Sequence, residues 1–438
     1  MRGRLNLFQA TMLRWREMHP YSAVHVVRVE RPLDAARLRI TIAEHLTELG
    51  LTGLELDRSG KRFEYKGGAT QTALRVHAGV DTPLEIVRRE IERELNTPFA
   101  RDGQFDPFRF FAVAAGGAFY LGLAYDHFVA GGDSIVVLLH GILARYVGAP
   151  TKLPAHPYLR YPPTLGHLFL RYPWAAIRGI GGLVELVQSC RRSVRPRYPG
   201  GADPHNAFAY CRMEPAQLAA LVGTAKAWAV SVNDLLMAIL LQVVGPLAGK
   251  RVPAHRRHEL AAASIVNLRR DLGLDPITTF GQFLSSLRVS HPLPPGISLE
   301  QLARDIAAKT ARIKRRKLYL QSLIAIGASG VAWRFLSPAE RGTYYARNYP
   351  VWCGITMLDI DALWAHAGGN LPPPEYLRAV STGPLSPMVV AVTTAAGVLH
   401  AGISYRTTAF STANIDKITA DIIACVKNLT HEPILSRP

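Results

Sequence analysis

The sequence predicts an α/β protein built from two lobes. At 438 residues the chain is too long for one compact core, since single cores rarely exceed about 300 residues. Apolar runs typical of strands alternate with segments of helical periodicity along the chain. A stretch dense in proline, from 149 to 204, predicts a connector. We therefore expect an N-terminal lobe at 1–165, a connector at 166–204 and a C-terminal lobe at 205–438.

The N-terminal half alternates helix and strand. Helical spacing predicts a first helix over 5–18, and the β-branched run from Val24 to Val29 predicts a strand. Asp34 as N-cap and Gly50 as stop signal bound the next helix. The later predicted elements are a helix over 83–95, strands over 108–114 and 118–124 joined by a turn at Ala115-Gly116-Gly117, and a buried helix over 135–146.

The C-terminal half repeats this mixture. The predicted elements are helices over 215–228, 231–247 and 298–316 and a strand pair across 387–406 that turns near Ala396-Gly397. Two largely apolar stretches, 165–187 and 318–336, are interrupted by polar and charged residues, which argues against a membrane span. We expect them to cover a core or to line an acyl tunnel, while their basic flanks also suit a peripheral membrane contact.

The net charge of +18, from 51 Lys and Arg against 33 Asp and Glu, favours anionic partners. Zinc-finger spacing, RNP-like motifs and basic heptad helices are all missing, so we do not expect a nucleic-acid partner. Acidic carrier proteins, coenzyme A and anionic lipid remain. Two basic runs could meet such partners or could be solvated surface: Lys309, Arg312, Lys314, Arg315, Arg316 and Lys317, and Arg191, Arg192, Arg195 and Arg197.

Cysteine usage and the N-terminus bear on the compartment. The four cysteines are scattered without a CxxC pair, so the sequence indicates neither a zinc site nor a disulfide framework. Charged and polar residues interrupt the apolar residues near Met1, which leaves no signal-peptide core. We expect a cytoplasmic protein, in contact with a membrane surface at most, that uses no metal or redox cofactor.

The stretch Asp126-His127-Phe128-Val129-Ala130-Gly131-Gly132-Asp133-Ser134 lies between a predicted strand and a buried helix. A turn of this kind exposes side chains at the edge of a sheet and aims the free N–H groups of a helix N-terminus at a ligand. A histidine there can titrate near neutral pH and act as a general base. Taken alone, His127 could equally satisfy a hydrogen bond of the turn.

This stretch resembles the HHxxxDG motif of the chloramphenicol-acetyltransferase-like superfamily, which includes condensation domains and many O- and N-acyltransferases. His127 matches the second histidine, Gly132 the motif glycine, and Ser134 the serine often found two residues later. Asp126 takes the place of the first histidine. The resemblance implies that His127 accepts the proton of the acceptor substrate.

The motif aspartate is also replaced. Gly131 stands at its position, and an aspartate appears two residues later as Asp133. In the family this aspartate is structural and pairs with the arginine of an NxR segment, which Asn267-Leu268-Arg269 resembles. An unpaired buried guanidinium would cost several kcal/mol. We therefore predict that Asp133 pairs with Arg269.

Further segments resemble the family in the expected order. They are His19-Pro20-Tyr21-Ser22, Ile265-Val266-Asn267-Leu268-Arg269, Phe280-Gly281-Gln282-Phe283, Gly354-Ile355-Thr356-Met357 and Leu399-His400-Ala401-Gly402-Ile403-Ser404-Tyr405. The resemblance implies two similar lobes with a tunnel between them. It gives His127, Gly132 and Asp133 as catalytic residues, with backbone N–H groups near Gly132 as oxyanion donors, and Ser134, Asn267, Arg269 and Thr356 as substrate-binding residues.

The expected reaction moves an acyl group from a coenzyme A or carrier-protein thioester to a hydroxyl or amine, as in natural product or lipid biosynthesis. The departures at Asp126 and Gly131 leave open a catalytically silent relative that binds a carrier protein or lipid. The same stretch also resembles the DxFF.LGGDSI signature of peptidyl carrier proteins, in which Ser134 would hold a phosphopantetheine arm. The strand hairpin before Asp126 does not fit that short helical bundle. A GDS-type serine hydrolase fits less well, because its motif normally opens the chain.

Overall fold

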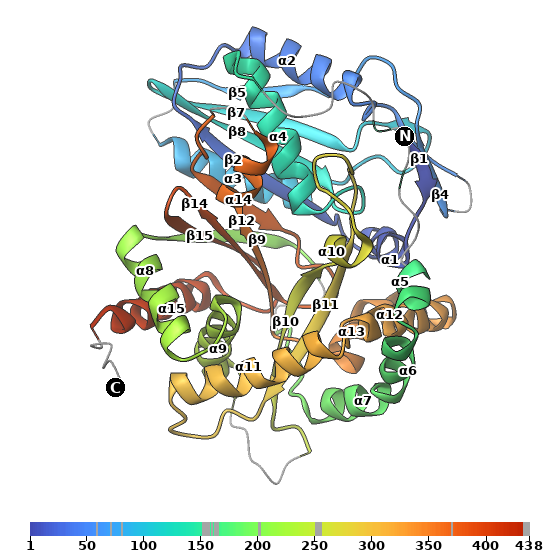
Figure 1. Cartoon of the computed structure of the whole chain (residues 1–438), viewed down its shortest axis with the longest axis vertical. Coiled ribbons are helices and arrows are strands. Elements are labelled where there is room, and N and C mark those ends of the chain that lie inside the picture. The colour runs from blue at the N-terminus through green and yellow to red at the C-terminus, as the bar shows by residue number, and fades with distance from the viewer. Residues whose placement is uncertain are drawn as a thin grey trace.

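The computed structural model describes residues 1–57, 60–70, 72–79, 82–150, 158, 161, 166–199, 203–249, 256–368 and 371–431. Within these ranges the chain forms three β-sheets with helices packed against them. Figure 1 shows two lobes, with most of the elements from β1 to α4 in the upper one and most of the later elements in the lower one. The predicted α/β, two-lobed fold is confirmed.

A five-stranded sheet in the order β13-β2-β8-β7-β5 forms the core of the upper lobe. Its strands are β2 (Ser22–Val29), β5 (Leu74–His77), β7 (Phe108–Ala115), β8 (Ala118–Asp126) and β13 (Tyr376–Val380). Helices α2 (Ala35–Glu48) and α4 (Gly132–Val147) cover one face, and α3 (Pro83–Asn96) covers the other. A small sheet lies beside it in the order β1 (Arg2–Arg4), β4 (Arg62–Tyr65), β3 (Leu54–Leu56) and β6 (Gln104–Phe105).

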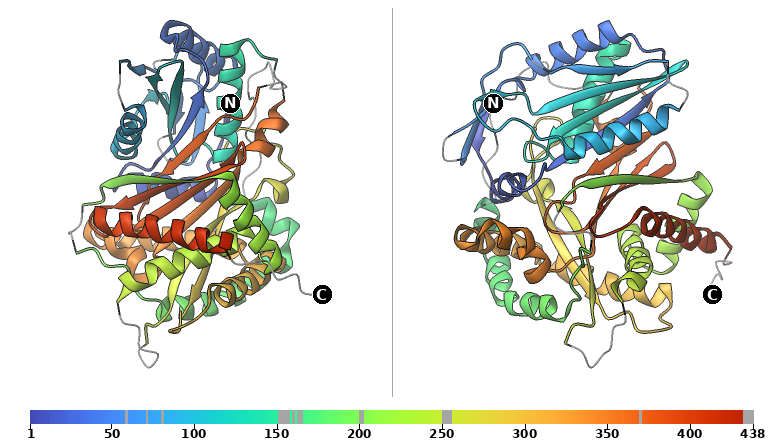
Figure 2. Two further views of the ribbon diagram at one scale, coloured as in Figure 1. Left: turned by 90° about the vertical axis from the view of Figure 1, so that its left-hand side faces the viewer. Right: turned by 180° about the vertical axis from the view of Figure 1, so that it is seen from behind.

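The lower lobe is built on a six-stranded sheet in the order β11-β10-β12-β14-β15-β9. Its strands are β9 (Asn206–Met213), β10 (Leu260–Asn267), β11 (Leu284–His291), β12 (Cys353–Asp359), β14 (Met388–Ala395) and β15 (Val398–Arg406). Four helices share an apolar core with this sheet: α8 (Pro215–Ala227), α9 (Val232–Val244), α11 (Leu299–Arg315) and α15 (Thr412–His431). Figure 2 shows them packed beneath the sheet.

The two lobes exchange one strand. After α14 (Ile360–Ala367), which packs on α4, the chain enters β13 and pairs antiparallel with β2. Gly402 allows this crossing, because a Cβ at that position would lie 1.9 Å from the carbonyl oxygen of Arg378. The sequence prediction assigned all of 205–438 to the C-terminal lobe, and β13 corrects it. The residue pattern of a segment can predict that it is a strand, but it does not predict which strand the segment pairs with.

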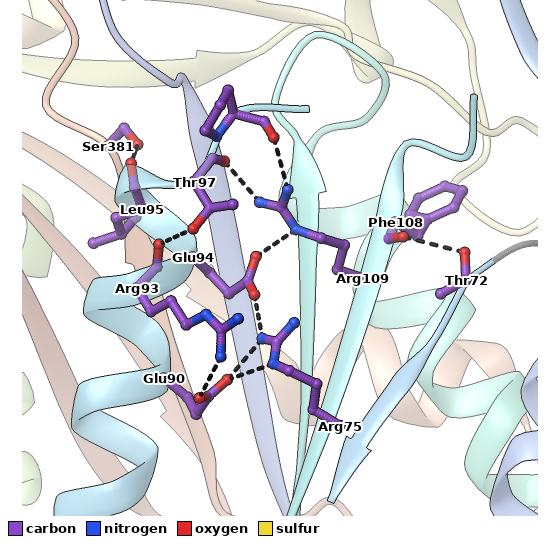
Figure 3. A network of polar contacts seen from close by, with 11 residues as sticks. Thr72, Arg75, Glu90, Arg93, Glu94, Leu95, Thr97, Phe108, Arg109 and Ser381 are labelled. Atoms are coloured by element: carbon purple, nitrogen blue, oxygen red, sulfur yellow. Dashed lines mark hydrogen bonds and ion pairs between the residues drawn. The ribbon is translucent and has the colours of Figure 1, made fainter. Parts of the chain in front are cut away.

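Buried charges fasten α3 to the upper sheet. The carboxylate of Glu94 is fully buried and accepts a hydrogen bond of 2.6 Å from Arg109 Nε and another from Arg75. Glu90 lies 2.7 Å from Arg75, and Arg109 also donates to the carbonyl oxygens of Thr97 and Pro98 (Figure 3). Two carboxylates therefore lie on the buried, otherwise apolar side of α3, where the sheet supplies their arginine partners.

Most predicted elements are present, and those that position the site begin or end within three residues of their predicted bounds. The first helix is α1 (Leu7–Arg16), the hairpin is β7 and β8, and the buried helix is α4. Asp34 caps α2 by accepting from the N–H of Arg37. The connector contains α5 (Gly166–Arg171), α6 (Pro173–Gly181) and α7 (Leu183–Arg192), while 151–157, 159–160 and 162–165 lie outside the described residues.

The stretch 318–336 forms α12 (Leu320–Ala332) and the 3-10 turn η2 (Trp333–Phe335), and α13 (Pro338–Asn348) follows. Leu320, Leu323 and Ile326 are buried in the main core, so α12 covers a core as predicted. In the described part of the chain, none of the helices is by itself long and apolar enough to cross a membrane. The helix α8 passes such a test only together with the segment 232–248, at a bend of 103°.

Candidate active site

The junction between β8 and α4 fixes the backbone around His127. The strand ends at Asp126 and the helix begins at Gly132. The N–H of His127 donates to the carbonyl of Tyr21 at 3.0 Å, and the N–H of Gly131 donates to the carbonyl of Gly281 at 3.0 Å. Segments from both halves of the chain thus hold this loop, and the helix N-terminus is aimed between the lobes.

His127 lies on a cavity of about 180 Å³ between the lobes. The upper-lobe lining comes from α1, β2, β8, α4 and β13, and the lower-lobe lining comes from β10, β11, β12 and β14. Among the lining residues are Phe8, Met12, Tyr21, His25, Tyr125, His127, Ile265, Leu284, Val351, Met357, Leu358 and Leu385. The walls are mostly apolar, as a cavity for an acyl chain requires.

Burial controls the protonation of His127. The side chain is enclosed, with the ring centroids of Tyr21 and Tyr125 at 5.4 and 5.7 Å. Desolvation lowers the pKa of His127 to about 4; the backbone at Ala130 acts against this shift, and the nearby Arg378 adds to it. The imidazole is therefore neutral at pH 7 and can accept a proton.

The predicted contact between Asp133 and Arg269 is present. Both side chains are buried, and the Nε of Arg269 lies 2.5 Å from Oδ2 of Asp133. Asn267 Nδ2 donates to the same oxygen at 2.9 Å. A Cβ at Gly131 would lie 2.9 Å from Oδ1 of Asp133, so a side chain there would crowd this carboxylate. The carboxylate that pairs with Arg269 therefore comes from position 133, two residues after the position of the motif aspartate.

Ser134 and Arg269 do not line the cavity. The Ser134 hydroxyl donates to the carbonyl of Gly281 at 3.1 Å and accepts from Arg269 at 2.5 Å. Arg269 also donates to the carbonyl of Thr279 at 2.8 Å. The structure therefore places both side chains behind the cavity wall, bracing the loop at Gly281, in contrast to the substrate-binding place predicted for them.

The other predicted site residues do line the cavity: Gly132, Asp133, Asn267 and Thr356. The amide of Asn267 is occupied by Asp133 and by the N–H of Arg269, so little of it is free for a substrate. Asp126, at the first histidine of the motif, is buried in an ion pair with Arg16 of α1. That pair secures α1 against the end of β8.

Three side chains around the cavity were missed by sequence reasoning. His25 Nδ1 lies 2.7 Å from the Tyr376 hydroxyl, and Arg378 lies on β13 opposite His25 of β2. The only local signal was a lone arginine in the apolar run Tyr376-Leu377-Arg378-Ala379-Val380. Within the described ranges, there is no cluster of His, Cys, Asp and Glu that could hold a metal ion.

A second cavity of about 650 Å³ adjoins the first, and Ser286, Tyr349 and Leu385 line both. It lies between α7, α12 and α13, and its lining includes five arginines: Arg191, Arg195, Arg256, Arg257 and Arg347. Two of them belong to a basic run identified in the sequence. The space next to His127 thus leads toward a positively charged one.

Comparisons with known proteins then decide the fold. No family model and no curated protein matches the chain. Solved structures do match over its whole length. The first condensation domain of the calcium-dependent antibiotic synthetase aligns at a TM-score of 0.71, with 15% identity, over 99% of this chain and 98% of that one. This chain has the condensation-domain fold.

Two other solved structures match over nearly the whole chain. SgcC5 from Streptomyces globisporus aligns at a TM-score of 0.68 with 17% identity, over 99% of each chain. Polyketide synthase associated protein 5 from Mycobacterium tuberculosis aligns at 0.65 with 14% identity, over 98% of each chain. The resemblance predicted from the motif order is confirmed at the level of the fold.

Proposed function

We propose that this protein is an acyltransferase that moves an acyl group from a thioester to a hydroxyl or amine, with His127 as general base. The observation that carries the proposal is a neutral imidazole on a cavity between two condensation-type lobes, beside the N-terminus of α4. A neutral base within reach of a bound acceptor is the first requirement of this chemistry.

The cavity supplies the groups that the reaction needs. His127 takes the proton as the acceptor oxygen or nitrogen attacks the thioester carbonyl, and the tetrahedral intermediate then expels the thiolate, which takes the proton back. The oxyanion would lie near the N–H of Gly132, because the N-cap residue Gly131 has no side chain to occupy the first turn of α4. Apolar walls would exclude water, which competes as a nucleophile.

The donor would enter through the second cavity. Its arginines suit the phosphates of coenzyme A or the acidic surface of a carrier protein, and its boundary with the first cavity at Ser286 would let a pantetheine arm reach His127. The four cysteines are all unpaired, which is consistent with a reducing, cytoplasmic setting. No metal or redox group is required for this transfer.

A catalytically silent binding protein is the competing function. The departures from the family motif at Asp126 and Gly131 motivate it. The ion pair from Asp133 to Arg269 supplies a brace from another position, which supports the enzyme over the silent protein. Asp126, in its buried pair with Arg16, still departs from the motif.

Incubating the protein with a panel of acyl-coenzyme A and acyl-carrier thioesters plus a cell extract, followed by mass spectrometry, tests the proposal. His127→Ala should lower product formation by about 100- to 10,000-fold, the usual contribution of a general base. His140→Ala is the matched control, since His140 is a fully buried histidine of α4 that does not line the cavity. Product loss in both variants, or in neither, would remove His127 from the mechanism. No product from the wild type would favour the silent reading.

A further inference from the structure

Arg378 is a buried cation in the active cavity that lacks an acidic partner among the described residues. It is 2% exposed and lines the cavity. Its Nε donates to the Thr393 hydroxyl at 2.9 Å, and its Nη2 donates to the carbonyl oxygens of Thr356 and Val392 at 3.1 and 2.5 Å. The buried Arg269, by contrast, has its own carboxylate.

The Nη1 atom of Arg378 lies beside the N-terminus of α4, on the same cavity as His127. A Cβ built on Gly132 would lie 3.4 Å from Nη1 of Arg378, so this nitrogen adjoins the first residue of α4. A helix N-terminus also carries a partial positive charge. Burial lowers the pKa of Arg378 to about 10, which still leaves it charged at neutral pH. Two positive groups therefore converge on one point of an otherwise apolar cavity, where an anion would be stabilised.

The same charge acts on the base. Arg378 contributes to the lowered pKa of His127 and also to that of His25. An anion bound to the guanidinium would offset this effect and raise the pKa of His127 toward its ordinary value. Since a base near the operating pH transfers protons more effectively, binding the anion would also activate the enzyme.

We propose that Arg378 binds a carboxylate carried by one of the two substrates, so that this transferase acts on carboxylic acids. The inference rests on the proposed function. With a hydroxy or amino acid as acceptor, the hydroxyl or amine loses its proton to His127, the new ester or amide bond forms, the carbon–sulfur bond breaks, and the thiol leaves with that proton. With a dicarboxylic half-thioester as donor, the same guanidinium would hold the distal carboxylate.

Binding can be measured without turnover, which separates this inference from the proposed function. Hexanoate and the neutral hexanamide serve as probes, with affinity taken from isothermal titration calorimetry. We expect the wild type to bind hexanoate at least about tenfold more tightly than hexanamide, and Arg378→Gln to abolish that difference while it retains hexanamide binding. Arg378→Lys should keep part of the preference because it keeps the charge.

Arg288→Gln is the matched control. Arg288 is another buried arginine that donates to Ser193 and to the Pro350 carbonyl, and it does not line this cavity. Its replacement should leave the preference for hexanoate intact. Equal binding of hexanoate and hexanamide by the wild type, or an unchanged preference in Arg378→Gln, would overturn the inference. The pKa of His127 from NMR should rise on hexanoate binding in the wild type and not in Arg378→Gln.

Once turnover is found, a comparison of substrates identifies which one carries the carboxylate. If the acceptor carries it, Arg378→Gln raises KM for acid acceptors and spares their amides. If the donor carries it, the variant discriminates against succinyl-coenzyme A relative to butyryl-coenzyme A. An equal effect of Arg378→Gln on all of these substrates would contradict a carboxylate site.

A second inference comes from the surface of the lower lobe. Of the eleven large apolar side chains that are most exposed in the described part of the chain, eight lie on α5, α6, α7, α12 and η2. They are Leu170, Trp174, Ile177, Ile180, Val184, Val187, Val331 and Phe335. We call these eight residues the apolar surface. The helices that carry them lie together at the lower right of Figure 1.

The helix α6 places its apolar residues outward. Trp174 and Ile177 are 70% and 58% exposed, while the small residues Ala175 and Gly179 face the protein. The inward side of α6 at Gly179 packs against α12, where a Cβ would meet the tip of Ile324 at an ordinary contact distance of 3.4 Å. A solvent-exposed helix normally has the opposite pattern, so the apolar surface needs a partner.

Basic residues border the apolar surface. Arg171, Arg178, Arg191 and Arg334 are exposed on the same elements, and Arg347 is exposed on the following helix α13. Of the acidic residues nearby, Glu185 is already paired with Arg312 at 3.1 Å. Apolar side chains bordered by arginine match the interface of a bilayer that contains anionic lipid. We infer that α5 to α7, with the end of α12, dock the enzyme on an anionic phospholipid surface.

Sedimentation with vesicles of phosphatidylcholine, with or without one third phosphatidylglycerol, tests this inference. The wild type should bind the anionic vesicles, and Trp174→Ser with Ile177→Ser should weaken partitioning by at least about tenfold. Ile40→Ser is the matched control, because Ile40 is 59% exposed on the distant helix α2. Equal losses in both variants, or failure of the wild type to bind anionic vesicles, would overturn it. So would a wild-type dimer that dissociates in the Trp174 variant, since a second copy would then cover this surface.

Discussion

Replacing Asp133 by alanine tests the brace behind the active cavity. The substitution leaves the guanidinium of Arg269 buried at 6% exposure without its carboxylate. Breaking a buried pair on one side costs about 3–5 kcal/mol. For 438 residues at about 2.1 cal/mol/K each, the unfolding entropy is about 0.9 kcal/mol/K, so the melting temperature should fall by about 3–5 °C.

A control variant and a rescue variant accompany Asp133→Ala. Glu300→Ala removes an exposed pair with Arg304, so it should cost less than about 1 kcal/mol and change the melting temperature by about 1 °C at most. Adding Gly131→Asp to Asp133→Ala restores a carboxylate at the family position, where it would also cap α4. We expect the double variant to recover at least half of the lost stability.

Calorimetry and circular dichroism measure the melting temperatures of Asp133→Ala, Gly131→Asp and the double variant, and these values test the brace. Gly131→Asp alone should be destabilising, since its side chain would crowd Oδ1 of Asp133. A melting temperature for Asp133→Ala within about 1 °C of the wild type would refute the brace, and so would a double variant that melts no higher than Asp133→Ala.

Four more outcomes follow from the described contacts. Because the pKa of His127 is about 4, kcat/KM should stay constant from pH 8 to about pH 5.5 and fall as the pH drops through 4. A decline centred near pH 6.5 would show that burial does not lower the pKa of His127. The same depressed pKa makes the unfolded state bind more protons than the folded state between pH 6.5 and 4. Because His25, His45 and His400 also have lowered pKa values, the test is a difference: in urea titrations across that range the wild type should lose up to about 3 kcal/mol more stability than His127→Asn, at about 1.36 kcal/mol per unit. Glu94→Ala removes the fully buried carboxylate that pairs with the partly exposed Arg109. It should lower the unfolding free energy by about 1.5–3 kcal/mol, with hydrogen exchange increased first in α3; exchange that increases elsewhere would argue against this anchor. Gly132→Ala puts a methyl group 2.6 Å from the tip of Leu358, in the cavity beside His127. Steady-state kinetics should show at least about a tenfold drop in kcat/KM, while the melting temperature stays within about 2 °C of the wild type. Unchanged kinetics would mean that no substrate approaches Gly132.

Features of the fold that depend on residues close together in the sequence could be predicted. The helix α4 and the hairpin before His127 follow from apolar periodicity and a glycine turn. The contact of Asp133 with Arg269 followed from motif order together with the energy of an unpaired buried cation. The capping of α2 by Asp34 needed only residues within one turn.

Long-range contacts could not be predicted. Arg378 looks like one charge in a short strand until β13 is known to pair with β2, which places it opposite His25. The pair of Arg16 with Asp126 joins residues that are 110 positions apart. Motif order correctly places Ser134 near the cavity, and on that basis its side chain was predicted to bind substrate. The hydroxyl instead points away from the cavity, because it hydrogen-bonds to Gly281 and Arg269.

The strand exchange has a consequence for synthesis of the chain. A ribosome adds about 5–20 residues per second, so β13 (Tyr376–Val380) follows β2 (Ser22–Val29) by roughly 17 to 70 s. Until then β2, which carries the apolar residues Val24 and Val26, is an open edge of the upper sheet. Open edges pair readily with other chains. Truncated products that end before β13 should therefore self-associate.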